Sequence, residues 1–500
     1  MKTVSATPKT PKKKSVNQEK HFFFPSNLSP NELNTVLTGI PGSSSILRGV
    51  MFLYDNILVD TYCVKPQKEE PEPEFLKGYS QVHSETLRSY FSNNYAKVID
   101  LLIQKGYLEP LQYNERGEYF ENGYYHFGCT SQGRCKSFRV PAHLFADGKK
   151  YQVIKQKLTQ REIKKFETIQ NRQIQYREEF RLTVIENMKN IELLRTPEAL
   201  KTVDKLFALN KVRARAETFF DVFNLNAVPK TPVCNFGHRV HSQVVYSPKV
   251  LRPWMRFRDE PDAPLVEIDL INSQPAILAN ITPKLIRLFA LECEAAIPFL
   301  EEALKEPDFQ YYKAKCNEGV IYEFLRDEFN REYADTLWEP IIRDDAKETY
   351  YVAGFSNYQY YETTTVRKFE RKLNKAVLKG NPDKIEKARK KLFKVRSYHL
   401  FKKLFPAAHR LFTQIKGLDW SGFNPGEHHS NNCLLAQRIE SGIIFTRLVK
   451  ALIDAGIPKE KIVTIHDSIM VREKDEEKAR KVIRRELDKL HLNIQLKTKF

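Results

Sequence analysis

Apolar residues in the middle of the chain recur with the period of an amphipathic helix. Within residues 151–224, four of them lie four positions apart with basic residues between them: Tyr176, Phe180, Val184 and Met188. Side chains four residues apart share one face of a helix, so the sequence predicts that 151–224 is helical. Residues 366–395 are charged on both sides of Gly380-Asn381-Pro382, which predicts two helices joined by a turn.

Two shorter segments have the pattern of buried strands beside an acid. LVEIDL (265–270) is β-like and ends at Asp269, and KIVTIHDSIMVRE (461–473) is centred on His466-Asp467. The first segment predicts one strand, and the second predicts a strand, a tight turn and another strand. Because helices and strands are both expected, the predicted fold class is α+β.

The first 150 residues differ from the rest in composition. Residues 1–20 carry six lysines and one acid, which predicts a disordered basic arm. Residues 65–74, KPQKEEPEPE, have the composition of a linker. The N-terminal module, 21–149, combines helical segments with short Tyr-rich and Phe-rich segments and resembles a winged helix. A structural cap on the next domain is the alternative.

Length and charge limit the function classes. A chain of 500 residues exceeds one ordinary hydrophobic core, so two or three domains are expected. Its 81 Lys and Arg against 62 Asp and Glu give a net charge of +19, which makes nucleic acid the first candidate partner. The sequence has no run of about 18 apolar residues, so no membrane partner is expected. The lack of a secretory signal pattern and the seven cysteines predict a reducing compartment, the cytoplasm.

Asp269 and Asp467 are candidates for a metal site. Each stands beside a predicted strand, and two carboxylates on neighbouring strands can hold two Mg²⁺ ions about 3.5–4 Å apart. Phosphoryl and nucleotidyl transfer commonly uses such a pair of ions. Taken singly, either aspartate also has the ordinary interpretation of a turn former.

A basic and aromatic row lies between these acids in the sequence. In RDDAKETYYVAGF (343–355), four residues recur at steps of four: Arg343, Lys347, Tyr351 and Phe355. On a helix they would form one row with the cations first and the rings after. Cations suit a triphosphate and rings suit a sugar or base, so the row is a candidate nucleoside-triphosphate platform. An amphipathic core helix is the alternative.

Six segments, in order, resemble motifs of the DNA polymerase I family (family A) and its single-subunit phage-type RNA polymerase relatives. They are FGHRVHSQ (236–243), LVEIDLINSQPAILA (265–279), RDDAKETYYVAGF (343–355), YHLFKKLFPAAHRLF (398–412), CLLAQRIESGIIFTRLV (433–449) and VTIHDSIMV (463–471). The resemblance implies a right-hand fold with an antiparallel palm sheet and helical fingers and thumb. The implied boundaries are 150–230 for the thumb, 231–283 with 425–500 for the palm, and 284–424 for the fingers, with a helical-hairpin insertion at 366–395.

The resemblance also implies roles at the centre of the site. Asp269, Asp467 and the backbone carbonyl of Leu270 would bind two Mg²⁺ ions, with Mn²⁺ as an alternative. Arg343 and Lys347 would hold the incoming triphosphate, where their charge offsets the negative charge of the transition state.

The remaining motif residues would contact the nucleotide and the nucleic acid. Tyr351 would pack on the sugar and Phe355 on the base, while His466 would orient the primer terminus. Three residues would contact the primer and template: Arg239, Ser242 and Gln437. Such contacts check base-pair geometry because minor-groove acceptors are shared by all base pairs.

Two of these positions depart from the DNA polymerase pattern. Gln274 stands where those enzymes place a glutamate that excludes ribose, and Phe355 replaces a tyrosine whose hydroxyl helps sugar selection. RNA synthesis, as a single-subunit RNA polymerase or primase, is therefore the alternative function. A catalytically inactive replication protein that binds nucleic acid is a second alternative.

The resemblance thus implies a DNA-directed DNA polymerase that acts in DNA replication of a phage, plasmid or other mobile element, in the cytoplasm of a bacterial or phage-infected cell. No set of three carboxylates suited to a proofreading exonuclease is found. The expected partners are a DNA template and primer, with RNA as the alternative, and nucleoside triphosphates. A monomer is favoured.

Overall fold

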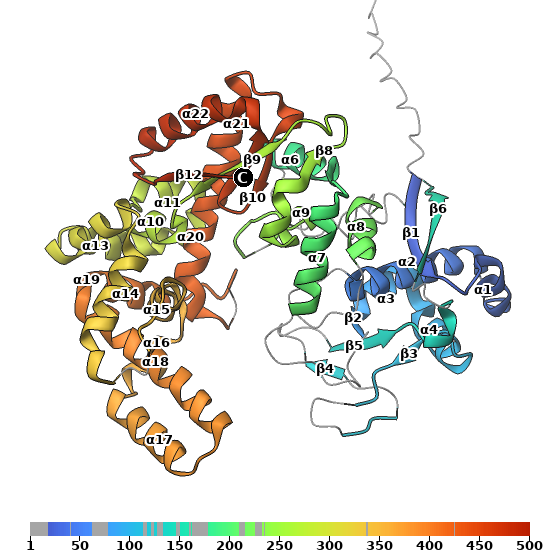
Figure 1. Cartoon of the computed structure of the whole chain (residues 1–500), viewed down its shortest axis with the longest axis horizontal. Helices are drawn as coiled ribbons and strands as arrows, with labels where there is room; N and C mark the ends of the chain where they lie inside the picture. The colour runs from blue at the N-terminus through green and yellow to red at the C-terminus, as the bar shows by residue number, and fades with distance from the viewer. Residues whose placement is uncertain are drawn as a thin grey trace, which may run out of the picture. The chain divides into compact units, whose positions relative to one another are not determined.

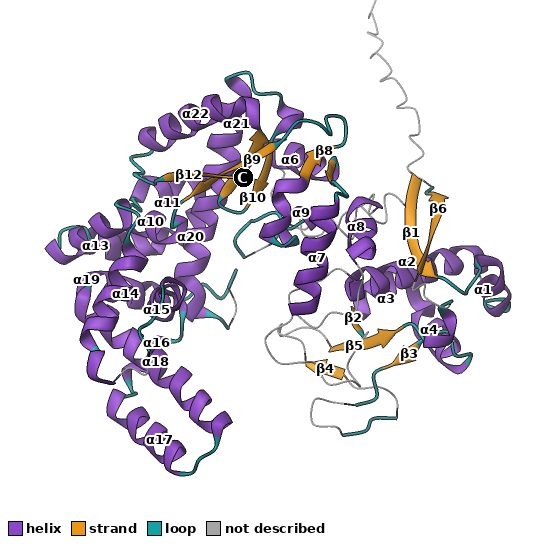
Figure 2. Cartoon of the chain, in the orientation of Figure 1, coloured by secondary structure: helices purple, strands orange, loops and turns teal. Residues whose placement is uncertain are grey.

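The computed structural model describes residues 19–40, 42–62, 79–113, 118–121, 125–127, 134–146, 151–159, 162, 179–209, 216–225, 233–234, 236–336, 339–424 and 426–500. Helices dominate and the sheets are small and antiparallel (Figure 2), which confirms the α+β class. The chain divides into two compact units. The first comprises Met1–Arg172, Glu192–Lys230 and Pro248–Trp254, and the second comprises Gln173–Ile191, Thr231–Ser247 and Met255–Phe500.

The first unit combines a two-stranded sheet, a second small sheet and several helices. Strand β1 (Glu19–Pro25) pairs antiparallel with β6 (Tyr151–Lys157), and Phe22, Phe23 and Phe24 are buried in its core. The second sheet has β2 (Ser80–His83), β5 (Arg134–Arg139) and β3 (Glu109–Pro110) in that order, with β4 (Tyr125–Phe127) also paired to β5. The helices are α1 (Pro30–Val36), α2 (Ser43–Tyr62), α3 (Ser84–Phe91), α4 (Tyr95–Gln104), α7 (Pro197–Leu209) and α8 (Ala216–Leu225). The winged-helix interpretation stays a prediction.

Two expectations for this unit need correction. The prediction that 151–224 is helical is wrong at two places, because Tyr151–Lys157 is strand β6, which pairs with β1, and Ile191–Leu193 is strand β7. Lys20, assigned to the basic arm, lies buried in β1 and forms an ion pair of 2.8 Å with Asp55. The negative charge of Asp55 offsets the cost of burying the Lys20 ammonium. Residues 1–18 of the arm, the 65–74 linker and Tyr176 lie outside the described residues.

A four-stranded antiparallel sheet lies in the second unit, in the order β10-β11-β9-β12 (Figure 1). Its strands are β9 (Leu265–Leu270), β10 (Val463–Ile465), β11 (Ser468–Arg472) and β12 (Leu496–Lys499). Strands β10 and β11 form a tight hairpin in which Ile465 pairs with Ser468, and His466 at the turn has a positive φ of 52°. Helix α22 (Glu476–Lys489) follows β11 and packs on the sheet.

The other helices of the second unit lie mainly between β9 and β10 in the sequence. They are α6 (Glu179–Lys189), α9 (Gln243–Tyr246), α10 (Ser273–Ala279), α11 (Pro283–Phe289), α12 (Ile297–Ala303), α13 (Pro307–Asn317), α14 (Ile321–Glu332), α15 (Arg343–Phe355), α16 (Tyr358–Glu362), α17 (Val366–Leu378), α18 (Pro382–Leu404), α19 (Pro406–Lys416), α20 (Asn431–Gly442) and α21 (Val449–Asp454). Local signals define several of their starts: the Asn381 side chain caps α18 by accepting from the Lys384 amide, and Pro382 follows as its first residue. Within the described residues, no helix has the length and apolar character needed to cross a membrane.

Candidate active site

Asp269 and Asp467 come together at one end of the four-stranded sheet. In the pairing of β9 with β11, Asp269 lies opposite Ser468, the residue that follows Asp467. The Leu270 amide donates a hydrogen bond of 3.2 Å to the carbonyl oxygen of Asp467. The two carboxylates, far apart in the sequence, are therefore neighbours, held by the register of two central strands.

Lys499 adds a positive charge to this pair. It comes from β12, on the other side of β9, and its Nζ lies 2.8 Å from Oδ2 of Asp269 and 3.4 Å from Oε1 of the buried Glu267. Burial raises the pKa of Asp269 against the hydrogen bond from Lys499, and the charges of Asp467 and Glu267 add to the rise. Such crowding of negative charge makes the site attractive to cations.

The donor set fits hard divalent cations whose remaining ligands come from outside the side chains. Carboxylate oxygens are preferred by Mg²⁺ and Mn²⁺, and Mg²⁺ often keeps water and phosphate oxygens as its other ligands. Among the described residues no group of three or more His, Cys, Asp or Glu side chains could hold a metal by itself. Asp269 and Asp467 could thus hold a metal with the help of substrate, water and a backbone carbonyl such as that of Leu270.

A buried polar chain connects Asp467 to Arg239. The Arg239 guanidinium donates to Oε1 of Glu440 through Nε at 2.8 Å and Nη2 at 2.6 Å. The Ser273 hydroxyl lies 3.1 Å from Oε2 of Glu440 and 2.7 Å from Oδ2 of Asp467. The sequence reasoning missed Glu440 and Ser273, although both lie within segments that carry the resemblance.

Glu440 is poised to exchange a proton near neutral pH. Burial raises its pKa to about 7 against the attraction of Arg239, and the charge of Asp467 adds to the rise. A hydroxyl has one proton to donate. When Glu440 is protonated it can donate to Ser273, which leaves the Ser273 proton for Asp467.

The segment with Arg239 packs closely on helix α20. A Cβ added to Gly237 would lie 2.7 Å from the Cβ of Gln437, so only glycine allows this approach. The Ser441 hydroxyl donates to the Gly237 carbonyl at 2.9 Å, and Arg438 Nε donates to the Phe236 carbonyl at 2.9 Å. The structure thereby places Arg239 and Gln437, both expected to contact primer or template, on two adjoining elements.

Ser242 and His466 occupy different environments. Ser242 is fully buried, and its side chain caps α9 by accepting from the Val245 amide, so it supports the segment and is not exposed for contact with nucleic acid. His466 is half-buried in the β10–β11 turn, with its ring centroid 5.6 Å from that of His241. His466 therefore lies directly beside Asp467 at the end of the sheet.

Helix α15 presents the predicted row on its less buried side. Tyr351 is 42% exposed and stacks near Phe355 at 5.6 Å between ring centroids, while Arg343 and Lys347 are half-buried. Four residues of the opposite side are buried: Ala346, Thr349, Tyr350 and Ala353. The helix predicted over 343–355 is confirmed, and packing of one side leaves the other side free to meet a ligand.

Arg343 connects this row to the acids. Its Nη2 donates to Oδ1 of Asn272 at 3.3 Å, and its Nε donates to Glu323. Asn272 follows Asp269 by three residues and has a left-handed φ of 51°, which turns the chain from β9 into α10. Gln274 lies half-buried in the first turn of α10. The cationic end of the row therefore begins next to the strand end that carries Asp269.

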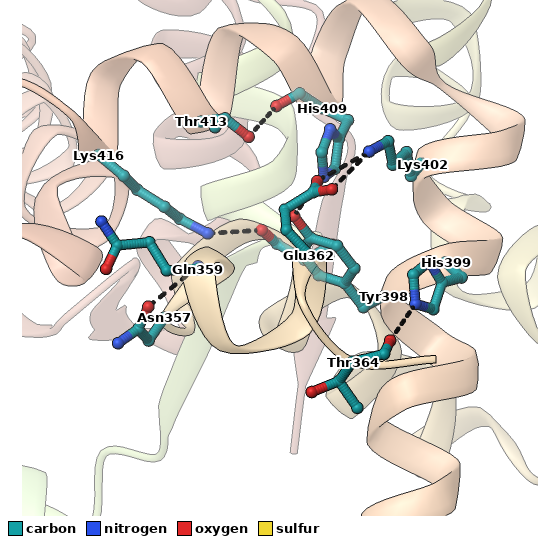
Figure 3. Close-up of polar contacts among 11 residues, drawn as sticks. Asn357, Gln359, Glu362, Thr364, Tyr398, His399, Lys402, His409, Thr413 and Lys416 are labelled. Atoms are coloured by element: carbon teal, nitrogen blue, oxygen red, sulfur yellow. Dashed lines mark hydrogen bonds and ion pairs between the residues drawn. The ribbon is translucent and has the colours of Figure 1, made fainter. Parts of the chain in front are cut away.

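Polar side chains of neighbouring helices hold the last turn of α15 by hydrogen bonds to its carbonyls. The buried Lys416, labelled in Figure 3, donates through its Nζ to the Ala353 carbonyl at 2.7 Å. Asn432 Nδ2 donates to the Gly354 carbonyl at 2.9 Å. Burial lowers the pKa of Lys416 to about 7. Nearby, Glu362 accepts hydrogen bonds of 2.8 Å from both Tyr398 and Lys402. The bonds from Lys416 and Asn432 hold the aromatic end of α15 in place, and those of Glu362 join α16 to α18.

No model of a known protein family matches the chain, and a search of curated proteins finds no match. The function of the site is therefore argued from its own residues.

Proposed function

We propose that the protein is a template-directed nucleotidyltransferase that extends a primer 3′-hydroxyl with nucleoside triphosphates, most simply as a DNA-directed DNA polymerase. One observation carries the proposal: Asp269 on β9 meets Asp467 in the turn before β11, the strand paired with β9, and Arg343 ties a cationic and aromatic helix face to the same strand end. Nucleotidyl transfer needs carboxylates for divalent ions, cations for the triphosphate and a flat surface for the nucleoside. All three are available in one unit of the chain.

In this reaction each group of side chains would have a separate role. Two Mg²⁺ ions held by Asp269 and Asp467 would make the primer hydroxyl more acidic and stabilise the leaving oxygen. Lys347 and Arg343 would bind the triphosphate and counter the charge that spreads over it in the transition state. Tyr351 and Phe355 would offer their rings to the sugar and base.

In this proposal Glu440 and Ser273 act as positioning residues. They join Asp467 to Arg239 through buried hydrogen bonds, so the carboxylate and the guanidinium keep a fixed relation. Arg239, Gln437 and His466 would contact the end of the primer-template duplex. The second unit would then supply palm and fingers, and residues 150–230 would supply the thumb.

RNA synthesis is the second candidate, and it is favoured by the side chains near the sugar position. Gln274 has no carboxylate with which to exclude a ribose 2′-hydroxyl, and Phe355 has no hydroxyl. Extension assays with dNTPs and NTPs side by side, with and without primer and in Mg²⁺, separate the two candidates. Use of NTPs alone, without a primer, would replace the DNA polymerase proposal by RNA synthesis.

Asp467→Asn tests the catalytic proposal itself. The substitution keeps the size of the side chain and removes its charge, so primer extension should fall by at least about a thousandfold while DNA binding persists. Asp454→Asn is the matched control, because Asp454 is an exposed acid on α21 paired with Lys450. Full activity of Asp467→Asn would refute the metal role of this residue and with it the proposed mechanism.

A further inference from the structure

Helices α17 and α18 form a helical hairpin (Figure 1), and positive charge is concentrated in its sequence. Residues 366–395 contain twelve Lys or Arg residues and three acids, a net charge of +9, whereas the whole chain has +19. Nearly half of the excess charge thus resides in 30 residues. The hairpin contains none of the residues assigned to the candidate active site, so the proposed reaction does not account for this charge.

Six lysines of the hairpin line one groove between the two helices. The groove has a volume of about 280 Å³, and its lysines are Lys372, Lys375, Lys379, Lys384, Lys387 and Lys391. All six are exposed. Phe369, Ala376 and Ala388 form its apolar floor. The small alanines let the lysines of one helix approach those of the other.

Nothing in the described part of the chain neutralises these six lysines by an ion pair. Two of the hairpin's acids are engaged with other residues: Glu370 pairs with Arg396 at 2.9 Å, and Glu386 pairs with Lys390 at 3.4 Å. Like charges that line one groove repel each other, and an anionic ligand relieves that repulsion. The arrangement therefore costs stability in the free protein and favours binding of an anion.

The spacing of the lysines indicates an extended anion. Both rows use the same steps of three and four residues: 372 and 375 on α17 with 379 at its C-cap, and 384, 387 and 391 on α18. At 1.5 Å per residue each row is about 10 Å long. A row of that length can follow roughly three successive phosphates of one nucleic-acid strand. A single small anion would leave most of the lysines without a partner.

Two exposed apolar residues lie near the turn of the hairpin, between Lys375 and Lys379 in the sequence. Leu378 is 87% exposed and Val377 is 39% exposed, and Gly380 with a φ of 61° makes the turn that follows them. An unpaired base offers an apolar face to such side chains, as when apolar wedges contact bases in other nucleic-acid complexes. A paired base in a duplex keeps that face covered.

We propose that the groove between α17 and α18 binds the phosphate backbone of a single nucleic-acid strand, with Leu378 against an unstacked base. The two lysine rows grip the strand from both sides. This binding site lies outside the catalytic residues, and the proposal stands whether or not the protein is a polymerase. In a polymerase it would hold a template or displaced strand.

The triple variant Lys375→Gln, Lys379→Gln, Lys387→Gln in the full-length chain tests the proposal. The probe is fluorescein-labelled oligothymidylate, and binding is followed by fluorescence anisotropy over a range of NaCl concentrations. Affinity should fall about tenfold or more at 0.1 M salt, and the slope of log K against log salt should decrease by about 2. The matching Lys→Arg triple variant should restore both.

A control with the same change of net charge replaces Lys450, Lys474 and Lys481 by Gln, since all three are exposed on other elements. It should leave affinity and slope nearly unchanged. An equal loss in the control would show that only the general charge matters, and an unchanged hairpin variant would exclude the groove; either result overturns the proposal.

Two further probes test the choice of ligand. The triple Lys→Gln substitution should reduce the affinity for a blunt duplex of the same length less than the affinity for the single strand. The substitution Leu378→Ser should weaken binding to the single strand only. Vesicles containing phosphatidylserine should not bind through the groove. A duplex that loses as much as the single strand, or vesicles that bind the wild type and not the triple variant, would overturn the single-strand assignment.

Discussion

Glu440 is the residue that connects the candidate catalytic acid to the segment expected to contact the primer. Its Oε1 accepts two hydrogen bonds from Arg239, and its Oε2 lies near Ser273, which contacts Asp467. A buried carboxylate in this position compensates a guanidinium whose side chain is only 15% exposed. The pair therefore serves both stability and the geometry of the site.

Glu440→Ala should destabilise the protein by about 3 kcal/mol, because the buried Arg239 and Ser273 lose the oxygens that accept their hydrogen bonds. Urea unfolding measures the change. The exposed Glu477 on α22 provides the control, since its ion pair with Lys481 is solvated and Glu477→Ala should cost less than about 0.5 kcal/mol. Equal, small effects of both substitutions would contradict the structural role of Glu440.

In the proposed mechanism Lys499 would compete with a divalent ion for Asp269. Its ammonium lies 2.8 Å from the Asp269 carboxylate, so metal binding there requires the lysine to withdraw. Lys499→Met should therefore enlarge the increase in Tm that Mg²⁺ produces, because binding to the folded state no longer displaces a cation. Asp269→Asn should abolish the Mg²⁺ effect, as measured by differential scanning fluorimetry with and without the ion. A smaller Mg²⁺ effect in Lys499→Met than in the wild type would count against competition.

The residues differ in how far the sequence could reveal them. Asp269 and Asp467 stand out because each is an acid beside a short apolar run, which is a local pattern. The Lys499 and Glu440 contacts depend on a third strand and on the packing of α20 against a distant segment, and no local pattern encodes such partners. Glu440 lies three positions after Gln437, on the same side of a helix, and that spacing was the available signal.

At the scale of the element, α15 shows what periodicity can and cannot establish. The four-residue step identified the helix and its less buried row, because a helix with one buried side must repeat its apolar residues at that step. It could not show that Lys416 and Asn432 bind the carbonyls of the last turn, since those side chains belong to α19 and α20. The strand β6 was missed for the opposite reason: its short alternating run lies next to a longer helical pattern, and only pairing with β1 decides its structure.

The buried Lys416 should make the stability of the second unit depend on pH. Its pKa is about 7 in the folded protein and about 10.5 in the unfolded chain, so below pH 7 both states are protonated and burial of the charge is fully unfavourable. Between about pH 7 and 10.5 only the unfolded chain holds the proton. Stability should therefore rise with pH by up to about 1.4 kcal/mol per unit in this window.

Lys416→Met should remove this contribution. The difference in unfolding free energy between wild type and variant, measured by urea unfolding from pH 6.5 to pH 9, should shift in favour of the wild type as pH rises. The exposed Lys403, which pairs with Glu332, is the control, and Lys403→Met should show no such trend. A constant difference for Lys416→Met across the range would mean that its ammonium is not penalised by burial.

At the scale of the whole molecule, the second unit is assembled from separated parts of the chain. Helix α6 precedes residues 192–230 of the first unit, yet it belongs to the second unit and packs beside β10. The Asn187 side chain donates to the carbonyls of Lys459 and Ile462, both at 2.7 Å. A distant helix therefore supports the loop that leads into β10, whose next turn carries His466 and Asp467.

Asn187→Ala tests whether this support reaches the candidate site. The loss of two hydrogen bonds, of which the one to the Ile462 carbonyl is buried, should cost about 1–3 kcal/mol in stability, and the loosened β10–β11 hairpin should also lower the primer-extension rate. Asn190 is a matched control three residues later, because its side chain bonds only the exposed Asp259 in the described structure, and Asn190→Ala should change stability by less than about 0.5 kcal/mol. Urea unfolding and extension assays on the full-length variants separate the two effects. If Asn187→Ala lowers stability but leaves the extension rate at the wild-type value, α6 supports the fold without positioning Asp467.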